Sequence, residues 1–194
     1  MKNLVDTNLL PLFFLKEGKY ACTHFQNGIL DLRSVKSKLF ISNEQKQWDS
    51  RYLSNSNSIK GVPLFLEITE KFSIAQIPNA TLLRFLLENQ QYIPLILPQE
   101  QINEIKIQRP KICFWGTIFY DKEGVKIGDN RYTKEYGCYI RSLYYSSAAG
   151  IWKDDFHSLE KNFSTEYPAL ILDQPSFTII KSLEGGFFII KLNK

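Results

Sequence analysis

The stretch KYACTHFQNGILDLR, from Lys19 to Arg33, holds two runs of β-prone residues on either side of the pair Asn27-Gly28. Asn-Gly between two such runs is typical of a β-hairpin, because both residues tolerate a positive φ. The sequence therefore predicts strands over Lys19–Phe25 and Ile29–Arg33, joined by a tight turn. This hairpin indicates a protein built mainly from antiparallel strands.

The rest of the chain repeats this β-rich pattern on both sides of its midpoint. The strongest single strand is KICFWGTIFY, from Lys111 to Tyr120, since β-branched and aromatic residues fill most of it. Val62–Ile68 predicts another strand, and Pro63 places its start at a sheet edge. Shorter runs predict further strands at residues 38–41, 47–53, 131–143, 169–172, 177–183 and 187–192, the last two as a hairpin.

Two short helices interrupt the predicted strands. Ala80–Gln90 carries leucines at helical spacing, and the side chain of Asn79 can cap its first turn. Asp155–Phe163 is the second predicted helix. Tyr92–Leu97 is interrupted by Pro94, which favours an edge segment or an extended loop.

The length and composition suit one folded unit. A chain of 194 residues with 44% apolar and 23% charged residues can bury a core without disulfide or metal support. We therefore predict a single β-rich domain over residues 1–194. Its class is α+β, mainly an antiparallel sheet with two short helices, and the sheet could curl into a partial barrel.

The cysteine pattern bears on location. The three cysteines, Cys22, Cys113 and Cys138, cannot all pair within one chain and show no C-x-x-C spacing. A reducing, cytoplasmic environment is therefore expected. No stretch reaches the roughly 18 apolar residues that a membrane span needs. We expect no membrane association.

Positive charge and aromatic rings gather beyond the midpoint. Residues 105–153 hold nine basic against four acidic side chains, and ten of the 27 aromatic residues of the chain. Such a mixture suits a polyanion with stackable bases, since cations hold phosphates and rings stack on bases. A β-rich core with solvated lysines on its outer face is the structural alternative. We predict nucleic-acid contacts for Lys122, Lys126, Arg131, Tyr132, Lys134, Tyr136, Tyr139 and Arg141.

Other rings of this segment suit a protein partner, because tyrosine, tryptophan and arginine are enriched at interface hot spots. The candidates are Trp115, Tyr144, Tyr145 and Trp152. Each could equally be a ring of the core, above all Trp115, which lies in mid-strand between apolar neighbours. We expect other protein subunits as partners, and single-stranded RNA as a further one.

Catalytic signals are scarce in the sequence. The chain has two histidines, which limits acid–base chemistry near neutral pH, and it shows no phosphate-binding loop, dinucleotide turn or serine elbow. Glu100 and the run Glu104-Ile105-Lys106 are faintly similar to the acidic-plus-lysine pattern of metal-dependent nucleases. The sequence therefore favours a non-enzymatic protein with no catalytic residue, metal or cofactor. The donor types of a zinc site, without its usual spacing, occur at Cys22, His24, Cys113 and Cys138.

One segment resembles a known family. KICFWGTIFYDKEGVKIGDNRY, from Lys111 to Tyr132, resembles the Leu-Trp-Gly-Thr stretch of the small accessory subunit of type III-D CRISPR effector complexes. The shared core here is Phe114-Trp115-Gly116-Thr117. KLFISNEQKQWDSRY, from Lys38 to Tyr52, is similar to that family's N-terminal pattern, in which a strand with Leu-Phe leads to a strand with Trp. Gly128-Asp129-Asn130-Arg131 departs from the family's Glu-Gly-Arg.

The resemblance implies a non-catalytic subunit of a ribonucleoprotein, packed against backbone subunits that hold a guide RNA. Trp115–Thr117 and the Gly185-Gly186-Phe187 hairpin are also similar to lipocalin-like phycobiliprotein lyases. That second likeness would imply a β-barrel that holds a linear tetrapyrrole. A small nuclease is the third possibility. We expect the first, a non-enzymatic subunit of an RNA-guided effector assembly.

Overall fold

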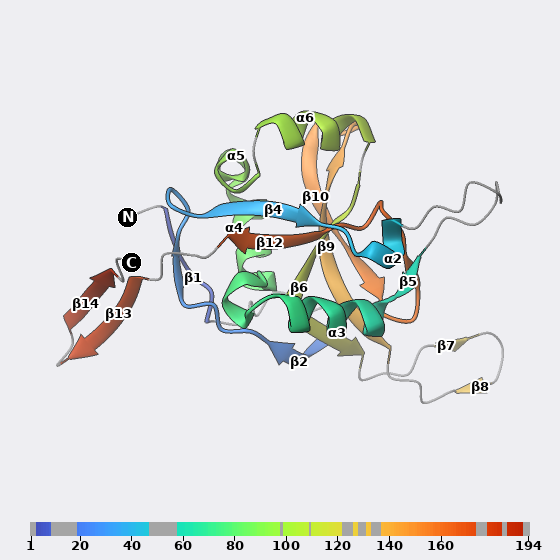
Figure 1. The fold of residues 1–194 in the computed structure, drawn as a ribbon, viewed down its shortest axis with the longest axis horizontal. Coiled ribbons are helices and arrows are strands. Elements are labelled where there is room, and N and C mark those ends of the chain that lie inside the picture. The colour runs from blue at the N-terminus through green and yellow to red at the C-terminus, as the bar shows by residue number, and fades with distance from the viewer. Residues whose placement is uncertain are drawn as a thin grey trace.

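The computed structural model describes residues 3–8, 19–46, 58–97, 99–108, 110–121, 126–127, 131–132, 137–173, 178–183 and 186–191. Helices and strands are mixed along the chain, and most strand pairs are antiparallel (Figure 1). The predicted α+β class is confirmed.

A sheet of six strands forms the centre of the described chain. Five strands follow the order β10-β9-β6-β12-β4, and β2 pairs with β6 off this path. β12 runs parallel to β6, and the other neighbours are antiparallel. The strands are β2 (Lys19–His24), β4 (Lys36–Phe40), β6 (Ile112–Asp121), β9 (Cys138–Ser146), β10 (Ile151–Ser158) and β12 (Ala169–Asp173).

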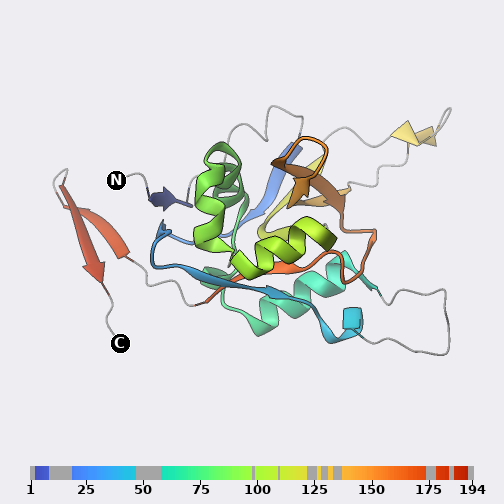
Figure 2. The ribbon, with the colours of Figure 1, turned by 90° about the horizontal axis from the view of Figure 1, so that it is seen from above.

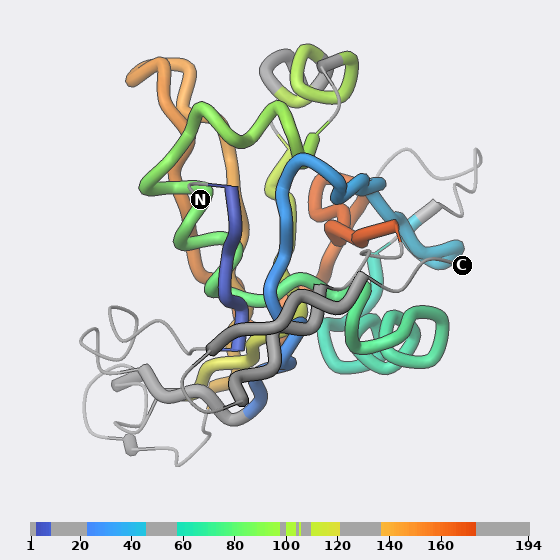
Figure 3. The backbone as a smooth tube through the Cα atoms, turned by 90° about the vertical axis from the view of Figure 1, so that its left-hand side faces the viewer, coloured from blue at the N-terminus to red at the C-terminus, as the bar shows by residue number. Residues whose placement is uncertain are grey.

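Helices cover both faces of this sheet, so that the core has two layers. On one face Leu82 and Ile105 pack with Leu170, and on the other Leu64 packs with Ile171. Figures 1 and 2 show α5 and α6 on one side of β4 and β12 and α3 on the opposite side, and Figure 3 shows α6 and α3 apart in the same way. The helices are α2 (Asn43–Lys46), α3 (Gly61–Lys71), α4 (Ala80–Glu88), α5 (Ile93–Ile96) and α6 (Gln99–Gln108), with 3-10 turns at Ile74–Gln76 and Gln90–Tyr92.

The helix predicted at Ala80–Gln90 is confirmed as α4. Asn79 caps it as expected, because its Oδ1 accepts hydrogen bonds from the amides of Thr81 and Leu82 at 3.1 and 3.2 Å. The same side chain donates from Nδ2 to the carbonyl oxygens of Thr7 and Phe25, at 2.7 and 2.6 Å. One buried amide therefore joins the start of α4 to two distant segments.

Three local predictions are wrong. The strand predicted at Val62–Ile68 lies inside α3, whose buried Leu64 and Ile68 are four residues apart; Pro63 fits because the first turn of a helix needs no amide donor. Tyr92–Leu97 contains α5, again with a proline in its first turn. The helix predicted at Asp155–Phe163 is replaced by the end of β10 (Ile151–Ser158), a turn, and β11 (Asn162–Phe163).

The predicted hairpin around Asn27-Gly28 is wrong in its pairing. Both strands exist, but β2 pairs with β6, while β3 (Ile29–Asp31) pairs with β1 (Leu4–Asp6) in a separate small sheet. Gly28 has the expected positive φ of 78°. Asn27 is buried, and its Nδ2 donates to the carbonyl oxygens of Ile74 and Ile77. These bonds anchor the turn to the chain before α4, and the two strands diverge.

The Phe114-Trp115-Gly116-Thr117 motif lies where β6 leaves its partner β9. Phe114 is opposite Arg141 and Phe119 is opposite Tyr139, so the register shifts between them. In this irregular stretch the Gly116 amide donates to Pro78 O at 2.9 Å, and Gly116 O accepts from Phe25 at 2.7 Å. The motif thus joins β2, β6 and the start of α4.

The remaining described strands form two-stranded ribbons. β5 (Ile59–Lys60) pairs with β11 (Asn162–Phe163), and β13 (Thr178–Leu183) pairs with β14 (Gly186–Lys191), which confirms the predicted last hairpin. The sheets of the described residues are open, and none closes into a barrel. Within the same residues, no helix has both the length and the apolar character to cross a membrane.

Candidate nucleic-acid interface

The antiparallel pair β9–β10 carries most of the predicted site residues that the structure describes. A turn at residues 147–150 joins the strands, closed by a 2.8 Å bond from the Gly150 amide to Ser146 O. Gly150 has a φ of 67°, which favours glycine there. Because side chains alternate along strands, this pair presents one set of residues to the α4 side and another to the opposite side.

On the α4 side, Arg141 is drawn into the protein. Its side chain is 5% exposed and forms an ion pair with Asp154. Its guanidinium carbon lies 3.8 Å from the centre of the Phe156 ring, the geometry of a cation–π contact. The prediction that Arg141 binds phosphate is therefore not supported, because burial keeps its charge from an external ligand.

Several rings predicted at interfaces also lie in the core. Trp115 is completely buried and tilts against Phe163, with ring centres 5.2 Å apart. Trp152 is 8% exposed and meets Tyr145 edge to face. Tyr139 is half-buried against Phe156. These rings pack against the apolar faces of the sheet. Trp115 and Trp152 are therefore rings of the core, which was the alternative to an interface role.

Six predicted contact residues lie outside the part of the chain whose side chains the structure describes. Lys122, Lys134 and Tyr136 lie outside the described residues. Lys126 belongs to β7 (Lys126–Ile127), and Arg131 and Tyr132 form β8 (Arg131–Tyr132). These two strands pair with each other as a ribbon. Nucleic-acid contact by these six residues stays a prediction.

On the opposite side of β9–β10, Tyr144 lies between two lysines. Lys153 is its direct cross-strand neighbour and is exposed. Lys111 directly precedes β6, and its Nζ lies 5.8 Å from the centre of the Tyr144 ring. Tyr144 itself is half-buried. A partly open ring flanked by two cations is an arrangement that can stack on a base and hold its phosphates.

The position of Lys111 is held by two neighbours. Its backbone amide donates to Glu166 O at 2.7 Å, and its Nζ donates to Asp155 Oδ2 at 2.9 Å. Partial burial disfavours the charge of Lys111, but the hydrogen bond and charge of Asp155 outweigh burial and raise its pKa. Burial of Asp155 is likewise outweighed by Lys111, and the pKa of the Asp155 carboxyl is lowered. Both groups are therefore charged at neutral pH.

Sequence reasoning missed Lys111 and Lys153 as members of a site. Lys153 stands opposite Tyr144 because residues 151–158 form a strand after a short turn. Had that segment been read as a strand, its alternation would have placed Lys153 on the face of Tyr144. The sequence offers no comparable signal for Lys111, since its neighbours come from β9 and β10.

Below this surface, Ser142 and His157 form a buried hydrogen-bonded pair. Ser142 Oγ lies 2.8 Å from His157 Nε2, and Ser142 is completely buried. Asp155 Oδ2 is 3.9 Å from the same Nε2. A nucleophilic triad needs the carboxylate on the other ring nitrogen and a serine that a substrate can reach. The pair therefore belongs to the interior of the protein, where His157 is 7% exposed.

The stability of the protein is expected to fall as the pH falls from about 6.5 to about 4. Burial lowers the pKa of His157 to about 4, helped by the charges of Lys111 and Lys161 and opposed by that of Asp155. Unfolded histidine titrates near 6.5, so in this window the unfolded chain binds more protons. The loss amounts to about 3 kcal/mol, and urea unfolding at a series of pH values measures it.

The variant His157→Gln should flatten this pH dependence while retaining a partner for Ser142. Burial also lowers the pKa of His24, so His24 adds to the same pH dependence. The matched variant His24→Gln should therefore retain the part of the pH dependence that comes from His157. An unchanged slope in His157→Gln would contradict the assignment.

Metal and thiol chemistry find little support in the described part of the chain. Within it, no group of three or more His, Cys, Asp or Glu side chains could hold a metal ion. Burial raises the pKa of the Cys113 thiol, which keeps it protonated. Glu100 lies on α6, as do residues 104 and 106, whereas the nuclease pattern requires paired strands.

Comparisons with protein-family models, curated proteins and solved structures found no match for this chain.

Proposed function

We propose that this chain is a non-enzymatic, RNA-contacting subunit of a larger ribonucleoprotein assembly of the RNA-guided CRISPR type. The observation that carries the proposal is the half-buried Tyr144 ring with Lys111 and Lys153 beside it. The resemblance of the Phe114–Thr117 stretch to an accessory subunit agrees with it. Burial of the Ser142–His157 pair argues against hydrolysis at that position.

Two physical features make this surface suited to single-stranded RNA. A tyrosine ring stacks on any base, and each stacked base contributes about 1–3 kcal/mol. The lysines can neutralise phosphates on either side of that base, which makes affinity depend on salt. Lys111 already carries a carboxylate partner, so the exposed Lys153 supplies most of the attraction for phosphate.

The full chain is expected to bind a labelled single-stranded RNA at low salt, and Tyr144→Ala should weaken this binding about tenfold or more, because the stacked ring is lost. Lys153→Ala should weaken it by a few-fold and reduce the salt slope by about one counterion. Fluorescence anisotropy across a salt series measures both effects.

Arg33→Ala is the matched control, since Arg33 is an exposed cation elsewhere that pairs with Asp31. It should bind RNA as the native chain does. If the native chain binds no RNA at low salt, or if all three variants bind alike, Tyr144 and Lys153 do not form an RNA site.

A further inference from the structure

The two ends of the strand order in the large sheet, β10 and β4, differ in the chemistry of their outer edges. At the β10 edge, the Gln90 side chain donates to Trp152 O and accepts from the Trp152 amide, both at 3.0 Å. The Phe156 amide donates to Asp155 Oδ1 at 2.8 Å. Side chains therefore occupy main-chain groups along β10, as expected for an edge closed to further pairing.

At the opposite edge, β4 pairs with β12, and no other described strand pairs with it. Lys36 and Lys38 are exposed and share the α3 face of this strand, while Ser37 between them is buried on the α5 side and donates to Ile96 O. Lys38 Nζ lies 3.3 Å from Asp173 Oδ1, and both side chains of this ion pair are about half exposed. Such an exposed pair is weak, so Lys38 can exchange partners.

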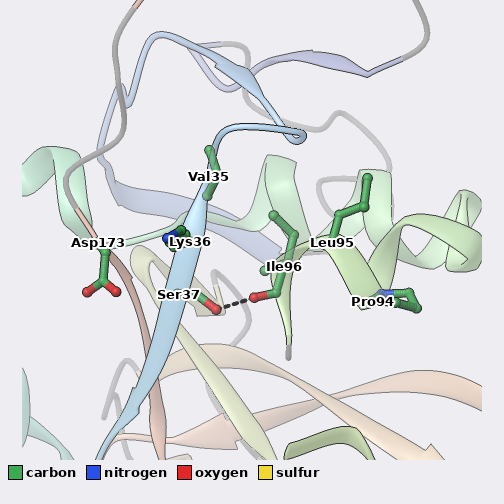
Figure 4. A pocket seen from close by; sticks show the side chains of 7 residues that line it. All are labelled: Val35, Lys36, Ser37, Pro94, Leu95, Ile96 and Asp173. Carbon is green, nitrogen blue, oxygen red and sulfur yellow. Dashed lines mark hydrogen bonds between the residues drawn. The ribbon is translucent and has the colours of Figure 1, made fainter. Parts of the chain in front are cut away.

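A pocket opens beside this edge. Its volume is about 290 Å³, and Figure 4 shows Pro94, Leu95 and Ile96 of α5 on one side of β4, with Asp173 on the other. Leu95 is 43% exposed, although it is a large aliphatic side chain. An apolar pocket next to an edge strand is the combination that strand-adding peptide sites use, with main-chain bonds for affinity and pockets for specificity.

We propose that the β4 edge binds an extended acidic segment of a protein partner by strand addition, with an aliphatic side chain in the pocket. In an added strand, residues that flank the aliphatic one share the face of Lys36 and Lys38. Acidic residues at those places match both lysines. The same lysines repel basic strands and deter apolar ones, which gives the edge its selectivity.

The test uses two fluorescein-labelled peptides, one of alternating Glu and Val and one of alternating Lys and Val. The native chain should bind the Glu–Val peptide saturably and show no binding of the Lys–Val peptide. The double variant Lys36→Glu/Lys38→Glu should reverse this preference. Leu95→Asp should weaken Glu–Val binding about tenfold, because it places a charge in the pocket. Amide hydrogen exchange of β4 should slow on binding.

Lys153→Glu, a single charge reversal away from the β4 edge, is the control and should bind the Glu–Val peptide normally. Equal binding of both peptides, or none by the native chain up to about 1 mM, would overturn the proposal. So would a dimer in sedimentation that Lys36→Glu/Lys38→Glu dissociates, because a second copy would then occupy the edge. The double variant should keep its RNA affinity, which separates this site from that at Tyr144.

Discussion

Replacing Gly116 by alanine is expected to lower the free energy of unfolding by about 3 kcal/mol or more. A Cβ at this position would lie 2.6 Å from Ile77 O and 2.8 Å from Pro78 O. Both are backbone atoms that cannot swing aside, and the Gly116 amide itself donates to Pro78 O. The methyl group therefore separates β6 from the start of α4. A drop in Tm of roughly 6–12 °C is the expected size for a chain of this length.

Gly150→Ala is the matched control for this experiment. Gly150 has a positive φ, but the nearest atom to an added Cβ is the Tyr145 hydroxyl at 3.9 Å. This variant should lose about 1 kcal/mol, from backbone conformation alone. Thermal unfolding of both variants measures the difference. A Gly116→Ala protein as stable as Gly150→Ala would show that β6 and the α4 start can separate without penalty.

Asn79→Ala is expected to cost about 3 kcal/mol. The substitution removes the cap of α4, worth about 1 kcal/mol. It also takes the Asn79 donor from the carbonyl oxygen of Phe25, and it leaves that of Thr7 with His24 Nε2, at 3.2 Å, in place of two partners. Asn79 is completely buried, so water cannot replace these bonds without rearrangement. Urea unfolding measures the loss. The dependence of the unfolding free energy on urea concentration should stay the same, which shows that the unfolded state is unchanged.

Two further variants separate the parts of this effect. Asn79→Ser keeps an oxygen that can cap the helix but has no amide donors, so it should recover about 1 kcal/mol of the loss. Asn89→Ala, at the other end of α4, removes one bond from a half-buried amide to Phe85 O and should cost under about 1 kcal/mol. If Asn79→Ala and Asn89→Ala prove equal, the link from α4 to Thr7 and Phe25 contributes nothing.

Predictions that depended on neighbouring residues succeeded most often. The leucine spacing and Asn79 located α4, and the positive φ at Gly28 followed from its turn. The strand through Lys111–Tyr120 corresponds to β6. Val62–Ile68 failed because a short apolar run satisfies strand and helix patterns alike; contact of Leu64 and Ile68 with the sheet decides in favour of the helix.

The candidate site was less accessible from sequence. Tyr144 was predicted to contact a protein partner, not RNA. Its neighbour Lys153 comes from β10, and Lys111 stands just before β6. Arg141 is basic and close to Tyr144 in sequence, yet it faces the other side of β9 and pairs with Asp154. Composition shows that cations and rings are plentiful in a segment; it carries no information about the face on which each one lies.

By itself, the sequence determined the class of the fold, the position and cap of α4 and the presence of most strands, since these depend on side-chain periodicity and hydrogen bonds within a few residues. The tertiary structure decided that β2 pairs with β6, that Gly116 lies against Pro78 and that Tyr144 stands between two lysines. Those outcomes depend on contacts between residues far apart in the chain. The burial of whole faces of the sheet selects these contacts. A shift of one residue in strand register would turn each side chain of that strand to the opposite face.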